Sequence, residues 1–223
     1  MDHLPPGHIR LLHIEAGFDN EPVRCRLETT SLEASPLYEA LSYTWGSLEL
    51  NSAITCNGAS MLVTHRLHEA LYYLREREHE RTVWIDAVCI NQEDLRERGE
   101  QVRIMKEIFA KAFHVVIWLG RETEEDQVAF SVLDRFKNLF DTRGYGDVGP
   151  ECYVDAGLPD TNDPDWAALV KLFQRPSFRR IWVVQEATVS RCKFSVPRSL
   201  GQTFDSLSIK LSLLWRNIEL TRR

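Results

Sequence analysis

Val83-Trp-Ile-Asp-Ala-Val-Cys-Ile-Asn-Gln92 is the stretch of sequence that decides the fold. From Val83 to Ile90 it is apolar except for Asp86, and such a run is typical of a strand buried on both faces of a sheet. A buried acid needs a hydrogen-bonding partner, and Asn91 and Gln92 bring two amides to the end of this strand. Asp86 therefore either caps a neighbouring helix or loop or contacts a ligand, and the pattern leaves both open.

Strands and helices alternate on either side of this stretch. The spacing of apolar residues predicts strands over 38–43, 115–119 and 193–196, and helices over 64–74, 94–111, 123–140, 166–173 and 182–186. Two extended segments, 8–14 and 23–28, come before them, and a hairpin that turns at Asn57-Gly58 lies between the strand over 38–43 and the helix over 64–74. We therefore expect an α/β fold whose central sheet is largely parallel and flanked by helices, with an extra N-terminal region of strands and a β-hairpin.

The carboxyl ends of the strands are where such sheets bind ligands, because the connecting loops converge there. By this rule a site is expected after Tyr43, after Val88 and after Leu119. Asp86 and the helix that carries Glu186 supply the acids expected to face this crevice.

The composition limits the classes of function. A net charge of −6 argues against non-specific binding to nucleic acid or to an anionic membrane, since both need a basic surface. The five scattered cysteines lack a Cys-x-x-Cys pair and the histidines lack ligand spacing, so we predict no disulfide framework and no metal site. The chain has no signal peptide and no apolar run of membrane-spanning length, so we expect a cytoplasmic protein.

Several common catalytic motifs are absent from the sequence. It has no Gly-x4-Gly-Lys phosphate loop, no Gly-x-Gly-x-x-Gly fingerprint and no Gly-x-Ser-x-Gly elbow. No base is assigned to Cys89, so we interpret this residue as a buried small hydrophobe rather than a nucleophile. Residues 141–165 are rich in Gly, Asp and Pro and predict a long surface loop.

A second stretch of interest is Arg175-Pro-Ser-Phe-Arg-Arg-Ile-Trp-Val-Val-Gln-Glu186. Its last part is mostly apolar and ends in a lone carboxylate, that of Glu186. In a helix Trp182 and Glu186 share one face, because they are four residues apart. Burying an unpaired ionised carboxylate is costly, so such a group is normally paired, protonated or used in chemistry. Arg179 and Arg180 are the candidates for a structural ion pair.

Four blocks of sequence together resemble the heterokaryon-incompatibility (HET) domain of filamentous fungi. They are Ala40-Leu-Ser-Tyr-Thr-Trp-Gly46, Trp84 to Gln92 with Gln101-Val102 and Met105, Ile117-Trp-Leu-Gly120, and Arg175 to Glu186. The blocks occur in the family's order over roughly residues 38–190. The resemblance implies that residues 1–223 are a single HET domain, with N-terminal strands in 1–37 and an uncertain C-terminal segment in 193–223.

The C-terminal segment departs from the family pattern. HET domains usually run into a strand that ends in Cys-Gly, whereas Cys192 is followed here by Lys193. Many members continue far beyond this domain, so we expect the chain to be a minimal form or a fragment.

The HET family implies a role in non-self recognition after cell fusion, which ends in growth arrest or programmed cell death. HET domains have been likened to TIR domains, so the resemblance also implies a TIR-like, flavodoxin-like fold. Ser42-Tyr43 resembles the Ser-Tyr that ends the first TIR strand, and the Asp86 strand resembles the second TIR region. Trp182-Val-Val-Gln-Glu186 resembles the TIR Trp-Cys-x-x-Glu, with Val183 in place of the Cys. That glutamate is catalytic in the TIR members that cleave NAD⁺.

The TIR likeness implies NAD⁺ as the substrate, with no cofactor and no metal. Glu186 would stabilise the oxocarbenium-like state that forms when the nicotinamide–ribose bond breaks. Trp45 or Trp182 would wall the pocket, and Tyr43 and Asp86 would line it. The remaining residues that the resemblance assigns to substrate binding are Ser42, Gly46 and Asn91.

Two alternatives stay open at this stage. In the first, the chain is a non-catalytic signalling module that self-assembles, and Glu186 pairs with Arg179 or Arg180. In the second, it is a degenerate and inactive copy. Whether the chain is an enzyme or a signalling module, the expected partners are further copies of the chain and an unidentified incompatibility protein.

Overall fold

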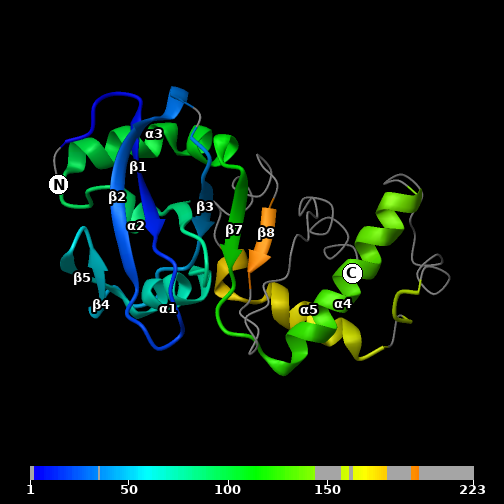
Figure 1. Cartoon of the computed structure of the whole chain (residues 1–223). Helices are drawn as coiled ribbons and strands as arrows, with labels where there is room; N and C mark the ends of the chain where they lie inside the picture. The colour runs from blue at the N-terminus through cyan, green and yellow to red at the C-terminus, as the bar shows by residue number, and fades with distance from the viewer. Residues whose placement is uncertain (1–2, 35, 144–156, 161–162, 180–191, 196–223) are drawn as a thin grey trace.

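The described residues of the computed structural model (3–34, 36–143, 157–160, 163–179 and 192–195) form an eight-stranded sheet with helices packed against it (Figure 1). The strands lie in the order β5-β4-β2-β1-β6-β3-β7-β8. Their bounds are β1 His8–Ile14, β2 Arg24–Ser31, β3 Glu39–Ser42, β4 Leu50–Cys56, β5 Ala59–Thr64, β6 Arg81–Trp84, β7 His114–Trp118 and β8 Cys192–Ser195.

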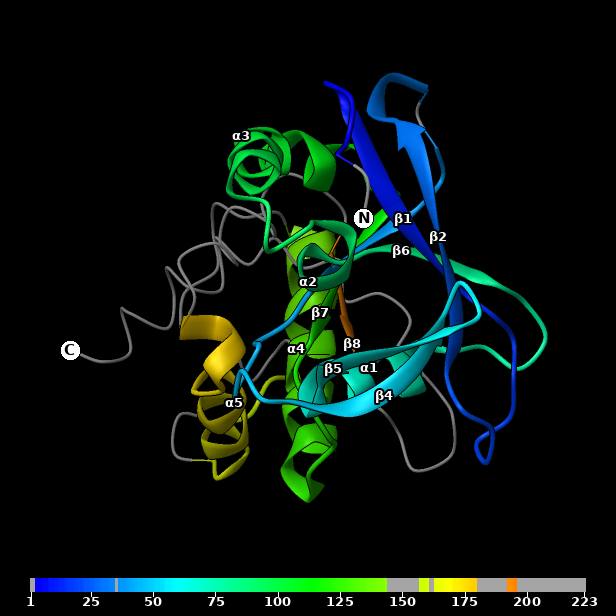
Figure 2. The ribbon, with the colours of Figure 1, turned by 90° about the vertical axis from the view of Figure 1, so that its left-hand side faces the viewer.

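The helices follow the strands in chain order. Their bounds are α1 His65–Leu74, α2 Asp86–Cys89, α3 Leu95–Lys111, α4 Glu124–Arg143 and α5 Asp165–Phe173, with short 3-10 turns at Leu32–Ala34 and Pro176–Arg179. Figure 2 shows α2 and α3 together on one side of the β1–β2 ribbon, and α4 and α5 side by side. None of the described helices is long and apolar enough to span a lipid bilayer.

The sheet is mixed, so the prediction of a largely parallel sheet is wrong. Strands β6, β3, β7 and β8 run parallel to one another, but β1 is antiparallel to both of its neighbours, β2 and β6, and β4 is antiparallel to β5. More residue pairs are antiparallel than parallel. The expected N-terminal strands and hairpin are present, and they extend the central sheet, because β1 pairs directly with β6. The TIR-like arrangement and the single-domain extent over 1–223 stay predictions.

The prediction of one continuous strand from Val83 to Ile90 is also wrong. Strand β6 ends at Trp84, and the chain turns into α2 at Asp86. The backbone N–H groups of Val88 and Cys89 both donate to the Ile85 carbonyl, at 3.1 and 2.7 Å. A buried helical turn is as apolar as a buried strand, so periodicity alone cannot distinguish the two over so short a run.

Two other predictions from short sequence signals, a hairpin turn and a helix cap, are confirmed by the structure. Asn57 and Gly58 adopt φ values of 51° and 77° and turn the β4–β5 hairpin. The Thr64 hydroxyl accepts a hydrogen bond from the Leu67 N–H and caps α1. Cys89 is fully buried, as predicted for a small hydrophobe, and burial raises the pKa of its thiol to about 12.

Candidate functional site

A pocket of about 580 Å³ opens at the carboxyl ends of β3 and β6. Its walls come from the turn that follows β3, from α2 and the connection to α3, and from one face of α3. The lining residues are Leu41, Ser42, Tyr43, Thr44, Trp45, Gly46, Asp86, Ile90, Gln92, Arg98, Val102, Met105 and Phe109.

Five of the predicted site residues lie together in this pocket: Ser42, Tyr43, Trp45, Gly46 and Asp86. They meet because β3 and β6 are parallel neighbours whose carboxyl ends share one edge of the sheet. Ser42 and Tyr43 are buried, while Trp45 and Asp86 are half-buried and follow the ends of the neighbouring strands β3 and β6. The expectation that a site lies at this edge is consistent with the pocket's position.

Trp45 and Asp86 are joined across the two strand ends. The Trp45 indole N–H lies 3.3 Å from both carboxylate oxygens of Asp86, and the Ala87 N–H donates to Asp86 Oδ1 at 2.7 Å. The Gln92 side-chain amide donates to the Asp86 carbonyl at 2.7 Å. The Asp86 carboxylate therefore accepts a hydrogen bond in the first turn of α2 and also lines the pocket. The helix-capping and ligand-facing roles considered for it are thus compatible.

Gly46 allows the turn after Trp45 to close. Its φ is +68°, a left-handed conformation that residues with a Cβ rarely adopt, and an added Cβ would lie 2.9 Å from Cδ of Arg66. The close approach of the Arg66 side chain packs α1 against the rim of the pocket.

We expect Gly46→Ala to lower the free energy of unfolding by about 1–2 kcal/mol, the usual cost of a left-handed conformation. Gly99 in α3 is the matched control, because an added Cβ there meets nothing within 4 Å. Gly99→Ala should instead stabilise the protein by roughly 0.5–1 kcal/mol, since alanine favours the helix. Urea denaturation of both variants measures the difference, and equal effects would contradict this account of Gly46.

Asn91 does not line the pocket, although the sequence suggested that it contacts substrate. Its backbone N–H donates to Glu97 Oε1 at 2.7 Å, and its side-chain oxygen accepts from the Glu93 N–H at 3.2 Å. Gln92, the next residue, takes the place in the pocket wall.

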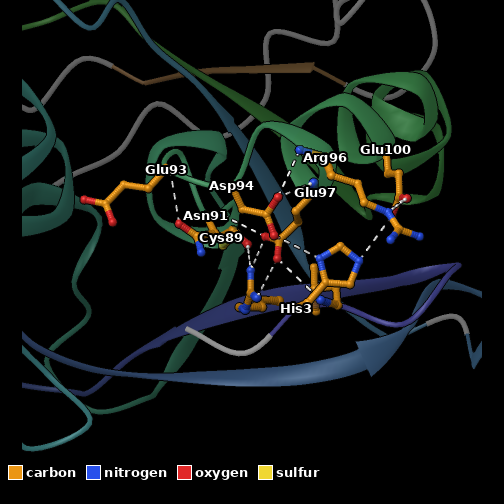
Figure 3. A network of polar contacts seen from close by, with 10 residues as sticks. His3, Cys89, Asn91, Glu93, Asp94, Arg96, Glu97 and Glu100 are labelled. Atoms are coloured by element: carbon orange, nitrogen blue, oxygen red, sulfur yellow. Dashed lines mark hydrogen bonds and ion pairs between the residues drawn. The ribbon is translucent and has the colours of Figure 1, made fainter.

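A buried ion pair between Arg10 of β1 and Glu97 of α3 supports this wall. Figure 3 shows the polar network around Glu97. Arg10 donates to Glu97 Oε1 at 2.6 Å and to Oε2 at 3.0 Å, and to the Cys89 carbonyl at 3.0 Å. The relative exposures of Arg10 and Glu97 are 5% and 0%. The pair thus fixes the backbone on both sides of Ile90, a pocket residue.

The electrostatics of Glu97 follow from these contacts. Burial alone would raise its pKa, but hydrogen bonds from Arg10 and from the backbone N–H groups of Asn91 and Leu4 lower the pKa below 4.5. His3, Asp94 and Glu97 place oxygen and nitrogen atoms within 4.8 Å of one another, the spacing of a cation site. These atoms already bond to each other, to Arg10 and to backbone N–H groups, so the cluster is explained as a protein network.

The apolar residues of α3 do not by themselves reveal the Arg10–Glu97 pair. Leu95 and Val102 have apolar side chains but are 70% and 47% exposed. Glu97 and Gln101 are buried instead. Their spacing of four residues is the one signal in the sequence that could have revealed a polar, inward-facing stripe.

The Arg175-Pro-Ser177 segment is attached to the same edge of the sheet. Arg175 forms an ion pair with the buried Asp126 at 2.6 Å and donates to the Leu119 carbonyl at 3.1 Å. Ser177 Oγ donates to the Trp118 carbonyl at 3.0 Å and lies 3.2 Å from the Thr44 hydroxyl. The chain is therefore held at the ends of β7 and β3 just before it leads to Trp182 and Glu186.

Trp182 and Glu186 themselves, with Arg180, lie outside the described residues, as do 144–156 of the predicted loop. The strand predicted over 193–196 is present as β8, which pairs in parallel with β7.

Comparison with known proteins identifies the family. The family model described as heterokaryon incompatibility protein (HET) matches residues 38–186. Heterokaryon incompatibility protein 6, OR allele, from Neurospora crassa is 30% identical in an alignment of 184 residues that covers 76% of this chain and 25% of that protein. No solved structure matches the chain. The chain thus spans about a quarter of the length of this relative. The match over residues 38–186 shows that the chain belongs to the HET family.

Proposed function

We propose that the chain is a cytoplasmic effector of heterokaryon incompatibility that triggers cell death by hydrolysing NAD⁺ in the pocket beside Trp45 and Asp86. One observation carries the proposal: the pocket lies at the end of the Ser42-Tyr43 strand, where the TIR likeness places the site. Its volume of about 580 Å³ is within the range of small-molecule sites, and its walls combine apolar side chains with a few polar groups.

The reaction needs little from the protein beyond one carboxylate. The bond between ribose C1′ and the nicotinamide nitrogen breaks, and nicotinamide leaves as a neutral molecule with the bonding electrons. Water adds to C1′ and releases a proton, so NAD⁺ and water give ADP-ribose, nicotinamide and H⁺. Glu186 stabilises the positive charge that develops on the ribose, and the leaving group requires no separate acid.

The described pocket residues fit the remaining tasks. The half-buried Trp45 ring offers a flat wall for nicotinamide, and the hydrogen bond to Asp86 fixes its orientation. The Asp86 carboxylate suits ribose hydroxyls, which donate hydrogen bonds to it. Apolar side chains of α3, among them Met105 and Phe109, line the pocket and exclude water on that side.

The test is to incubate the purified chain with NAD⁺, both dilute and artificially oligomerised, and to measure free nicotinamide. We expect release that increases on oligomerisation, since the proposed effector acts when copies associate. Absence of release in every assembled state would refute the enzymatic proposal.

A second candidate function is a non-catalytic assembly module, and the β4–β5 hairpin favours it. Strand β5 forms one edge of the sheet, and Leu48, Leu50 and Leu62 at this hairpin are 69%, 59% and 56% exposed. Exposed apolar side chains along a sheet edge promote pairing with another chain. Under this proposal further copies of the chain, and an unidentified incompatibility partner, bind there.

The two candidates differ in which substitution removes toxicity on expression. If the chain only assembles, toxicity survives Glu186→Gln but is lost in Leu62→Asp. Leu37→Asp is the matched control, because Leu37 is 75% exposed and lies before β3, away from the hairpin. If the chain is an enzyme, Glu186→Gln removes toxicity by itself.

A further inference from the structure

Arg98 is the one cation among the described residues that line the pocket, and within this part of the chain no hydrogen bond or ion pair engages its guanidinium. The acids around it on α3 are already bonded elsewhere. Glu97 turns inward to Arg10, and Glu100 pairs with Arg96 at 3.1 Å. A guanidinium at a pocket wall with no protein partner is therefore available to an anionic ligand.

The helix directs Arg98 toward the pocket. Arg98, Val102, Met105 and Phe109 follow one another at intervals of four, three and four residues, which places them on one face of α3. All four line the pocket. Arg98 thus lies in the first turn of α3, at one end of a helix face whose other pocket-lining residues are apolar.

Another lining residue carries the opposite charge. Asp86, with the Trp45 indole on its carboxylate, begins α2, while Arg98 comes from α3. A carboxylate repels phosphate and accepts hydrogen bonds from hydroxyls, whereas a guanidinium binds phosphate through two parallel N–H donors. A pocket with both charges favours a ligand with hydroxyls at one end and phosphate at the other.

We infer that Arg98 binds a phosphate of the substrate, so that the pocket selects nicotinamide nucleotides over the phosphate-free nucleoside. The inference rests on the proposed NAD⁺ hydrolysis and adds the residue that sets the substrate class. Arg98 is a specificity residue in this account, because it contacts the phosphate and not the bond that breaks. Arg98 also supplies a local positive charge for an anionic substrate on a chain whose net charge is −6.

Three substrates with the same breaking bond test the inference: NAD⁺, nicotinamide mononucleotide and nicotinamide riboside, which lacks phosphate. For the wild-type chain we expect kcat/KM to be about 10- to 100-fold higher for the two nucleotides, the effect of a charge-assisted hydrogen bond. Arg98→Gln should bring the ratio of nucleotide to riboside close to one. Arg98→Lys should retain part of the preference, since it keeps the charge but loses the two-donor geometry.

Arg103→Gln is the matched control. Arg103 is an exposed arginine of the same helix that does not line the pocket, so its substitution changes the charge of α3 equally. The wild-type preference should persist in this variant. A preference that survives Arg98→Gln, or that falls equally in Arg103→Gln, would overturn the inference.

Binding of ADP-ribose by calorimetry separates this inference from the proposed reaction, because it requires no turnover. We expect wild-type and Arg103→Gln chains to bind ADP-ribose, and Arg98→Gln to bind it about 10- to 100-fold more weakly. Binding that depends on Arg98 without release of nicotinamide from NAD⁺ would refute the reaction and support the phosphate site. Absent binding, or binding unchanged by Arg98→Gln, would refute the phosphate site.

Discussion

Glu186→Gln is expected to lower the release of nicotinamide from NAD⁺ by about 100- to 1000-fold, the range observed when one electrostatic group is removed from an active site. Glutamine keeps the size of glutamate but not its charge, so it leaves the developing cation on ribose without a counter-charge. The measurement is the single-turnover rate of nicotinamide release at saturating NAD⁺, which separates chemistry from binding.

The control for Glu186→Gln is Glu93→Gln, because Glu93 is exposed and does not line the pocket. Thermal unfolding of both variants shows whether each still folds. If Glu186 is instead tied to Arg179 or Arg180, Glu186→Gln lowers the unfolding temperature and leaves turnover unchanged. That pattern would contradict the catalytic assignment.

The second large effect concerns stability. We expect Arg10→Met, which leaves Glu97 buried with an uncompensated charge, to lower the free energy of unfolding by about 3–5 kcal/mol. The double variant Arg10→Met, Glu97→Leu removes both charges and should recover most of this loss. Urea denaturation measures all three proteins.

The matched control for the buried pair is the exposed pair of the same helix, Arg96 and Glu100. Glu100→Gln should lower the free energy of unfolding by less than about 1 kcal/mol, because solvent screens the pair. Similar losses in Arg10→Met and Glu100→Gln, or a double variant no more stable than Arg10→Met, would contradict the proposed role of the buried pair.

The ion pair also predicts how stability varies with pH. The pKa of Glu97 is lower in the folded protein than its ordinary value of 4.5, since its bonds to Arg10 and to backbone N–H groups outweigh burial. The unfolded chain therefore binds the proton more tightly, and the contribution of Glu97 is complete above the unfolded pKa. It disappears as the pH falls through the folded pKa. The stability difference between the wild-type chain and Glu97→Gln should shrink over this acidic window.

Local signals in the sequence were sufficient to predict many elements, because short-range chemistry determines them. The Asn57-Gly58 turn and the Thr64 cap depend only on residues close by in the chain. The pairing of β1 between β2 and β6 does not, since β1 and β6 are far apart in sequence and either edge of a hairpin can pair. This is why the expected parallel sheet became a mixed one.

The candidate site likewise has features that could be predicted from the sequence and features that could not. The position of Ser42, Tyr43 and Asp86 at one edge could be predicted, because it follows from two parallel strands that end together. The pairing of Glu97 could not be predicted, since its partner Arg10 is 87 residues away in the chain. The burial of the Glu97 carboxylate in the face of α3 can be explained only once its ion-pair partner, Arg10, is known.

The central claim of the proposal is that NAD⁺ binds and is cleaved in the pocket beside Trp45 and Asp86. The most direct test is a crystal structure of the Glu186→Gln variant with NAD⁺, because the substrate should persist in an inactive protein. The account predicts the nicotinamide ring against Trp45, the ribose hydroxyls on Asp86 and residue 186 facing C1′. NAD⁺ bound elsewhere, or an empty pocket at saturating NAD⁺, would contradict it.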